Sequence, residues 1–136
     1  MKPLSTLRCI GAALCVATMA LAGHVMAATP QELLAGYAAE AGAAPAPARG
    51  QRFFTQRHGR DWSCSSCHGA SPTTPGQHQA TGKTIAPLAP AYNGQRFTDA
   101  AKTEKWFGRN CNDVTGRACS TGEKADVLVW LLSLQP

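Results

Sequence analysis

Two cysteines and a histidine stand together near the middle of the chain, in the run Cys64-Ser65-Ser66-Cys67-His68. A C-x-x-C-H run allows two thiols to add across the two vinyl groups of one haem, while the adjacent imidazole nitrogen reaches the iron. The residues therefore predict a c-type haem attached covalently through Cys64 and Cys67, with His68 as an axial ligand.

Two other kinds of site share the C-x-x-C spacing. A structural zinc site needs a second pair of ligands at comparable spacing, and a thioredoxin-like redox pair should follow a buried strand and open a helix. Neither context is visible around Cys64 and Cys67. Because the chain also begins like an exported protein, most cytosolic alternatives are removed and haem attachment is favoured.

Residues 1–27 have the pattern of a secretory signal peptide. A basic start is followed by an apolar run over residues 10–22, and small residues predict cleavage after Ala27. A retained membrane anchor is the alternative, but the run is too short to span a bilayer. We therefore expect a periplasmic mature chain, residues 28–136, that forms a single domain.

The mature composition is poor in large aliphatic and aromatic side chains. Residues 28–136 contain only 15 Leu, Ile, Val and Phe among 109 residues. A small domain of this kind needs something else to bury, which a haem supplies. Eleven basic residues face eight acidic ones, and this charge of +3 is too modest to indicate nucleic-acid binding.

Helical patterns dominate the mature chain. Helices are expected over residues 30 to about 41, 48–57, 98–109 and 122–134, the first and last introduced by the capping boxes Thr29-x-x-Glu32 and Ser120-x-x-Glu123. Prolines and glycines make residues 69–95 a loop that should wrap the haem edge. The pattern predicts an all-α, class I-like cytochrome c fold.

Gly50 and Phe54 share one face of the second predicted helix. A glycine on that face permits close backbone approach, and the apolar last helix is the expected partner. Two ordinary core helices with no defined crossing are the alternative.

The second axial ligand decides the function. Methionine is excluded for a cleaved chain, because Met1, Met19 and Met26 all precede the cleavage point. Lysine, tyrosine, histidine, asparagine and an empty position remain.

Three side chains deserve comparison as second ligands. His58 is better explained as a solvated helix-end residue, whereas His78 lies in a polar loop and is a candidate ligand. Asn110 follows Trp106 and Phe107, which we expect to contact the haem, but it could equally be the C-cap of its helix.

Cys111 and Cys119 cannot hold a second haem, since their spacing is wrong and no histidine follows. In an oxidising compartment we expect them to form a disulfide, worth about 2 to 4 kcal/mol.

Here a family resemblance becomes specific. The mature chain resembles the sphaeroides haem protein (SHP) family of monohaem cytochromes c almost throughout. The motifs that carry the likeness are Gly36-Tyr37, Thr81-Gly82-Lys83, Ile85 to Pro90, Phe97-Thr98-Asp99, Trp106 to Asn112, Gly116 to Cys119 and Gly122 to Asp126.

The resemblance implies roles for individual residues. Asn110 matches the family's distal ligand, bound through its amide oxygen in the ferric form, and Asn112 is the neighbour most easily confused with it. Cys111 and Cys119 match the family's disulfide beside the haem. A dihaem cytochrome c and a membrane cytochrome b are implied as electron donors.

An amide oxygen is a hard donor that suits ferric better than ferrous iron. We therefore expect Asn110 to leave on reduction, so that a small diatomic molecule such as O₂, NO or CO can bind. The protein is then an electron-accepting cytochrome, which we expect to be a monomer. The alternatives are a simple electron-transfer cytochrome with His68 and His78 as ligands, and a gas sensor or scavenger without a redox partner. No catalytic acid or base is identifiable, which favours electron transfer and ligand binding over an enzyme that reduces a small oxidant.

Overall fold

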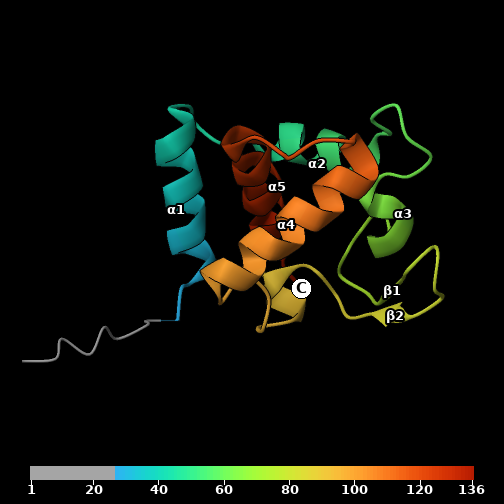
Figure 1. Cartoon of the computed structure of the whole chain (residues 1–136). Coiled ribbons are helices and arrows are strands. Elements are labelled where there is room, and N and C mark those ends of the chain that lie inside the picture. Colours follow the sequence, from blue (N-terminus) through green and yellow to red (C-terminus); the bar gives the residue numbers. More distant parts are fainter. Residues whose placement is uncertain (1–26) are drawn as a thin grey trace, which may run out of the picture.

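The computed structural model describes residues 27–136 (Figure 1). The predicted signal peptide lies outside these residues, apart from its final residue, Ala27. The elements are helices α1 (Pro30–Ala41), α2 (Pro47–Thr55), α3 (Cys64–His68), α4 (Ala100–Thr115) and α5 (Thr121–Ser133), strands β1 (Gly76–Gln77) and β2 (Thr84–Ile85), and the 3-10 turn η1 (Pro90–Tyr92). Within the described part no helix is long and apolar enough to cross a membrane. The predicted all-α class is confirmed.

The first helix begins and ends where the sequence indicates. The Glu32 N–H donates to Thr29 Oγ1 over 3.1 Å, and the Thr29 N–H donates to the Glu32 carboxylate over 2.7 Å, which completes the capping box. Gly42 then takes a left-handed conformation, with φ of 63°, and ends the helix. Tyr37 is the buried residue of α1 and packs against apolar side chains of α5.

Helix α2 crosses α5 at a glycine. A Cβ on Gly50 would lie 1.9 Å from the carbonyl oxygen of Asp126, so only a glycine permits this approach. The Asp126 carboxylate also accepts hydrogen bonds from the Ala46 N–H and from the Arg49 guanidinium, each at 2.7 Å. The close approach predicted for Gly50 and the last helix is confirmed, and Asp126 caps α2 from outside that helix.

The main core lies beside this crossing. Phe54 of α2 and Leu131 of α5 are almost completely buried, and Val127 and Trp130 complete the cluster. Partly buried apolar side chains from other segments pack against it: Phe53, Cys64, Leu88, Phe97, Phe107 and Leu134. Because one of them is a cysteine of the C-x-x-C-H run, the core and the candidate site are continuous.

Helix α4 is longer than the sequence predicted and begins at Ala100, two residues after the predicted start at residue 98. Asp99 is the N-cap, and its carboxylate accepts the Lys102 N–H at 2.9 Å. The helix continues past Asn110 to Thr115, where Gly116 ends it with φ of 74°. The interpretation of Asn110 as a C-cap is therefore wrong.

Buried residues explain the extra turns of α4. Cys111 and Val114 continue the buried side of the helix beyond Phe107, so ending it at residue 109 would leave both without packing.

The predicted loop contains a small hairpin. Strands β1 and β2 pair antiparallel, with Gly76 opposite Ile85 and Gln77 opposite Thr84. The remainder of residues 69–95 has only the turn η1 as a regular element.

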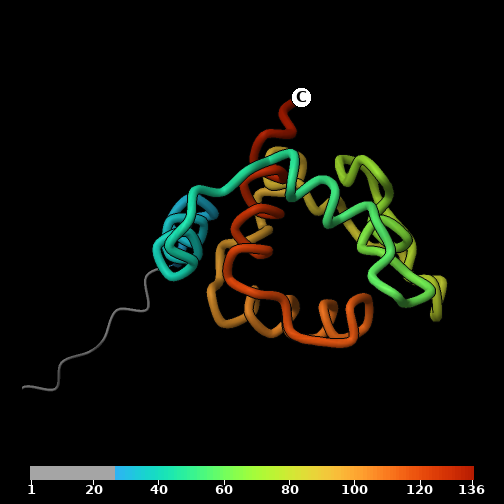
Figure 2. Tube along the Cα trace, turned by 90° about the horizontal axis from the view of Figure 1, so that it is seen from above, coloured from blue at the N-terminus to red at the C-terminus, as the bar shows by residue number. Residues whose placement is uncertain are grey.

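Seen from above, the backbone forms an open ring (Figure 2). Helix α2 lies at the top of this view, α3 and the hairpin on the right, α4 at the bottom and α5 on the left. No main chain of the described residues crosses the central region. The C-x-x-C-H run and α4 therefore lie on different sides of the ring.

Candidate haem site

Helix α3 presents the three residues of the attachment motif on one face. The Ser63 N–H donates to Ser66 Oγ at 3.0 Å and starts the turn, and Gly69, with φ of 78°, ends it. Residues three and four apart in a helix share a face, so Cys67 and His68 lie on the same side as Cys64.

The hairpin holds α3 in place from outside. A Cβ on Gly76 would lie 2.0 Å from the carbonyl oxygen of Cys67, so the glycine lets β1 lie directly on the motif backbone. The Gln79 side chain adds a hydrogen bond to the carbonyl of Ser66, at 2.6 Å.

Cys64 and Cys67 are not paired in a disulfide, so both sulfurs are available for haem attachment. Burial raises the pKa of the Cys64 thiol to about 11, so it is protonated at neutral pH. Within residues 27–136 no group of three or more His, Cys, Asp and Glu side chains could hold a bare metal ion. A zinc site at Cys64 and Cys67 therefore lacks its remaining ligands there.

His68 is prepared as a neutral ligand. Burial, with a further contribution from the positive charge of Arg96, lowers the pKa of the imidazole to about 4. A neutral ring nitrogen has a lone pair to offer to iron. The His68 ring lies 6.1 Å from the ring of Phe54 between centroids, which connects the ligand to the core.

Helix α4 supplies large aromatic side chains. Phe107 is partly buried and packs against the main core and against a second buried cluster formed by Tyr37, Ala125 and Leu128, whereas Trp106 is 45% exposed. The Arg109 guanidinium lies 5.9 Å from the centre of the Trp106 ring. Asn110 stands one turn beyond Trp106 on the same helix.

The two asparagines that sequence reasoning could confuse are different in the structure. The Asn112 side chain donates to the carbonyl of Gly108 at 2.7 Å, so its amide is engaged by its own helix. Among the described residues, the Asn110 side chain makes no hydrogen bond with the protein and is exposed.

The end of α4 lies beside the segment that precedes the attachment motif. Arg60, Asp61 and Trp62 line a shallow hollow together with Asp113, which is one turn beyond Asn110. The Arg60 guanidinium also approaches the carbonyl of Asn112, at 3.4 Å. The helix face that carries Asn110 is therefore near the start of the C-x-x-C-H run.

The predicted disulfide between Cys111 and Cys119 is present, with the two Cα atoms 5.6 Å apart. Both cysteines are buried, and they connect the end of α4 to the start of α5. The residue directly after Asn110 is thus fixed covalently.

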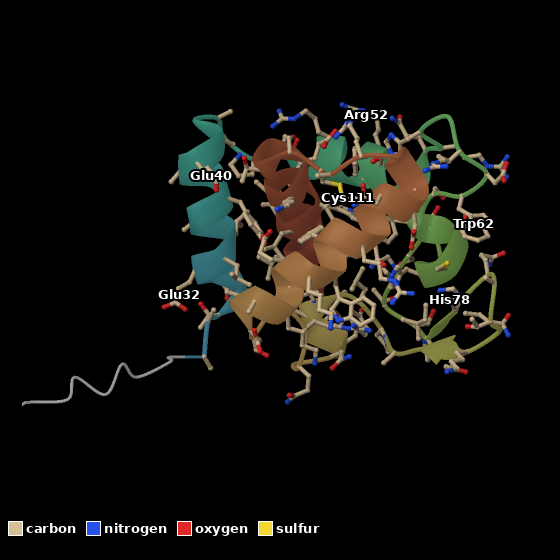
Figure 3. The ribbon with its side chains drawn as sticks, in the orientation of Figure 1. Glu32, Glu40, Arg52, Trp62, His78 and Cys111 are labelled. Atoms are coloured by element: carbon tan, nitrogen blue, oxygen red, sulfur yellow. A yellow bond between two sulfur atoms is a disulfide. The ribbon has the colours of Figure 1, made fainter. Side chains whose placement is uncertain are left out.

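The other two histidines have their own local contacts. The His58 Nε2 lies 2.8 Å from the carbonyl of Phe53, and its ring contacts the Phe53 ring at a tilt of 44°, with the centroids 4.3 Å apart. The His78 Nδ1 accepts the Ala80 N–H at 3.2 Å. Figure 3 shows His78 near α3 and the hairpin, whereas Cys111 lies on α4.

Sequence reasoning missed two residues that position the site. The glycine at position 76 carried no signal beyond its place in a loop. Arg96, which influences His68, lies 28 residues further along the chain, and no local pattern links the two.

Two cysteines outside any disulfide and a neutral imidazole on one face, beside apolar and aromatic side chains, are the donor set and lining that haem c needs. The residues of this site therefore fit the group.

Comparisons with known proteins identify the family of this chain. Residues 40–131 match the family described as a domain of unknown function, DUF1924. The cytochrome c-type protein SHP of Cereibacter sphaeroides is 53% identical over 117 residues, which are 82% of this chain and 90% of that protein. Cytochrome c″ of Methylophilus methylotrophus is 42% identical over 94 residues, 66% of this chain and 65% of that protein.

Solved structures are similar as well. Oxidised SHP, described as an oxygen-binding cytochrome c, has a TM-score of 0.75 at 50% identity and covers 79% of this chain and 99% of its own. Oxidised cytochrome c″ from Methylophilus methylotrophus has a TM-score of 0.73 at 36% identity, with 79% and 95% covered. A solution structure of the same protein, concerned with haem-ligand detachment, has a TM-score of 0.71 at 35% identity, with 79% and 94% covered. This chain belongs to the DUF1924 family of c-type cytochromes, together with SHP and cytochrome c″, and its cofactor is haem c.

Proposed function

We propose that this protein is a periplasmic monohaem cytochrome c that accepts an electron and then binds a small diatomic molecule. Cys64 and Cys67 form the thioethers, and His68 is the permanent axial ligand. The observation that carries the proposal is Asn110, whose amide has no other partner among the described residues and stands on the aromatic face of α4. The oxygen binding described for SHP and the ligand detachment described for cytochrome c″ support it.

The bound haem would supply an iron that alternates between ferric and ferrous states and accepts ligands on both faces. Asn110 offers that iron a hard, neutral oxygen, which stabilises the ferric form more than the ferrous form. Reduction therefore weakens the hold of Asn110, and the distal position becomes available to O₂, NO or CO. One electron thus shifts the balance between a closed and an open site.

The surroundings of Asn110 limit how it can leave. Its backbone lies inside α4, the disulfide at Cys111 fixes the next residue, and the Arg60 guanidinium donates to the carbonyl of Asn112. A rotation of the side chain is sufficient, whereas a shift of the backbone would break these contacts.

The electron donors remain a proposal of the same kind. A dihaem cytochrome c and a membrane cytochrome b would deliver electrons to the exported protein. Mixing the reduced dihaem protein with the oxidised holoprotein in a stopped-flow spectrometer tests this step, and no electron transfer within minutes would contradict it.

Visible spectra of the purified holoprotein test the gate. The wild type is expected to be low-spin or mixed when oxidised, to become high-spin with dithionite, and to shift sharply with CO. Asn110→Ala should make the oxidised form high-spin and leave CO binding to the reduced form intact. Asn112→Ala is the matched control and should behave as the wild type, because its amide serves the Gly108 carbonyl.

Two results would redirect the proposal. If Asn110→Ala keeps the wild-type oxidised spectrum while His78→Ala changes it, the ligand is His78. If the reduced wild type stays low-spin and ignores CO, the iron is closed in both states, and the protein is a simple electron-transfer cytochrome with His68 and His78 as ligands.

A further inference from the structure

Arg96 is held in a fixed position close to the candidate haem site. It lies in the turn between η1 and α4, and its side chain folds back onto the segment that follows β2. The Arg96 Nε donates to the carbonyl of Pro87 at 2.9 Å, and Nη2 donates to the carbonyl of Ala86 at 2.6 Å. Leu88 and Phe97, the neighbours of Pro87 and Arg96 in the chain, pack against the same core cluster as Cys64, so the guanidinium lies beside the site that holds the attachment motif.

Within residues 27–136, no acidic side chain forms an ion pair with Arg96. The ion pairs among the described residues are Arg49–Asp126, Arg117–Glu123 and Lys124–Glu104. Arg96 is partly buried, and burial lowers the pKa of its guanidinium. A partly buried cation is costly unless an anion or further hydrogen bonds accompany it.

The guanidinium has hydrogen-bonding capacity to spare. Arginine carries five N–H donors in a planar fork, and the two carbonyls engage one on Nε and one on Nη2. Both donors on Nη1 and the second on Nη2 remain. These are adjacent edges of the fork, which suit a carboxylate bound through two parallel hydrogen bonds.

The next residue ties Arg96 to the site. Phe97 adopts a φ of 59°, and its ring packs against the same core cluster as Cys64 and Phe107. A left-handed conformation at a phenylalanine is held only by its surroundings. The turn that carries Arg96 is therefore a rigid part of the site wall.

We propose that Arg96 binds a propionate carboxylate of the haem through the Nη1–Nη2 edge of its guanidinium, while Pro87 and Ala86 hold the other edge. Haem carries two such carboxylates, and within residues 27–136 Arg96 is the partly buried arginine beside the attachment motif that has no acidic partner. This inference rests on the proposed haem attachment but not on the release of Asn110.

The reduction potential of the holoprotein tests the proposal. Arg96→Gln removes the charge and leaves the propionate negative charge uncompensated, which favours ferric iron. The equilibrium constant for reduction should fall on the order of tenfold, or about 59 mV for a one-electron couple. Arg52→Gln is the matched control: Arg52 is exposed on α2 and makes no ion pair among the described residues, so its replacement should shift the constant less than about twofold.

Resonance Raman spectroscopy separates binding from mere structural support. Arg96→Lys keeps the charge but loses the two-pronged geometry, so the potential should stay near the wild type while the propionate bending mode shifts. If Arg96→Gln fails to fold, the Arg96→Lys variant alone provides the test, and an unchanged propionate mode in that variant overturns the proposal. A folded, haem-loaded Arg96→Gln protein with wild-type potential overturns it as well.

Failure of the proposed function gives different signals. A haem that is not attached shows in the pyridine haemochrome spectrum of the wild type. A failed gate shows as wild-type CO binding being absent, whatever the state of Arg96.

Discussion

Replacing Gly50 by alanine tests the close contact between α2 and α5 at Asp126. The added Cβ would lie 1.9 Å from the Asp126 carbonyl oxygen, and ordinary contacts begin at 3.4 Å, so α2 and α5 must separate by about 1.5 Å. The obstacle is backbone and cannot rotate away. Overpacking costs about 1–3 kcal/mol, and a clash with backbone belongs at the upper end, about 3 kcal/mol.

Helix propensity acts in the opposite direction. Alanine is favoured over glycine by about 1 kcal/mol in a helix interior, so the net loss should be about 2 kcal/mol. For a domain of this size that lowers the Tm by roughly 8–16 °C. Denaturation of the holoprotein by guanidinium chloride, followed by far-UV circular dichroism, measures the change directly.

Gly36→Ala is the matched control. Gly36 lies inside α1, and a Cβ there would meet nothing within 4 Å, so only the propensity gain applies. This variant should be about 0.5–1 kcal/mol more stable than the wild type. If Gly50→Ala is stabilised to the same extent as Gly36→Ala, the two helices do not meet as described and the reasoning is refuted.

Two further predictions concern the ends of helices. The hydrogen bond from Arg117 lowers the pKa of the Glu123 carboxyl in the folded protein. In acid the unfolded chain therefore binds more protons than the folded protein does. The stabilisation from this carboxylate is complete above about pH 4.5 and is lost as the pH falls through the folded pKa. Glu123→Gln should therefore cost about 1 kcal/mol at pH 7 and little in strong acid; an equal loss at both pH values would contradict the assignment. Replacing Cys111 and Cys119 together by serine removes a disulfide of sequence separation 8 and should cost about 2.5 kcal/mol, measured by denaturant titration. We expect the double variant to be as stable as the wild type with its disulfide reduced, and less stable than the oxidised wild type. Equal stability of the double variant, the reduced wild type and the oxidised wild type would contradict the prediction.

Local signals predicted much of the fold correctly. The capping boxes at Thr29 and Ser120 mark the starts of α1 and α5 because their hydrogen bonds involve only residues three apart. Gly50 predicted a close crossing of two helices because glycine has no side chain, a property that is visible from the single residue.

Errors arose where tertiary contacts override local preferences. The third predicted helix ended at residue 109, but Cys111 and Val114 are buried and carry the helix to Gly116. The hairpin at Gly76 could not be foreseen either, because its partner at Ile85 lies across a loop of prolines and glycines.

The chemistry of the candidate site divides in the same way. The residues of the attachment motif lie close together in the sequence, so Cys64, Cys67 and His68 could be predicted as haem-attachment residues from their spacing alone. The distal side depended on family resemblance, since nothing near Asn110 distinguishes it from Asn112. The hydrogen bond that separates them becomes visible only when the carbonyl of Gly108 is placed beside one amide.

The attachment of α2 to α5 has a mechanical consequence. Gly50 lies directly on the main chain of Asp126, and the Asp126 carboxylate accepts hydrogen bonds from Ala46 and Arg49. These contacts at one residue of α5 oppose both separation and sliding of α2. Phe54, whose ring lies 6.1 Å from the His68 ring between centroids, is part of this helix. The side of the site that carries Phe54 is therefore fixed to α5 at Asp126, whereas Asn110 stands on a separate helix, α4.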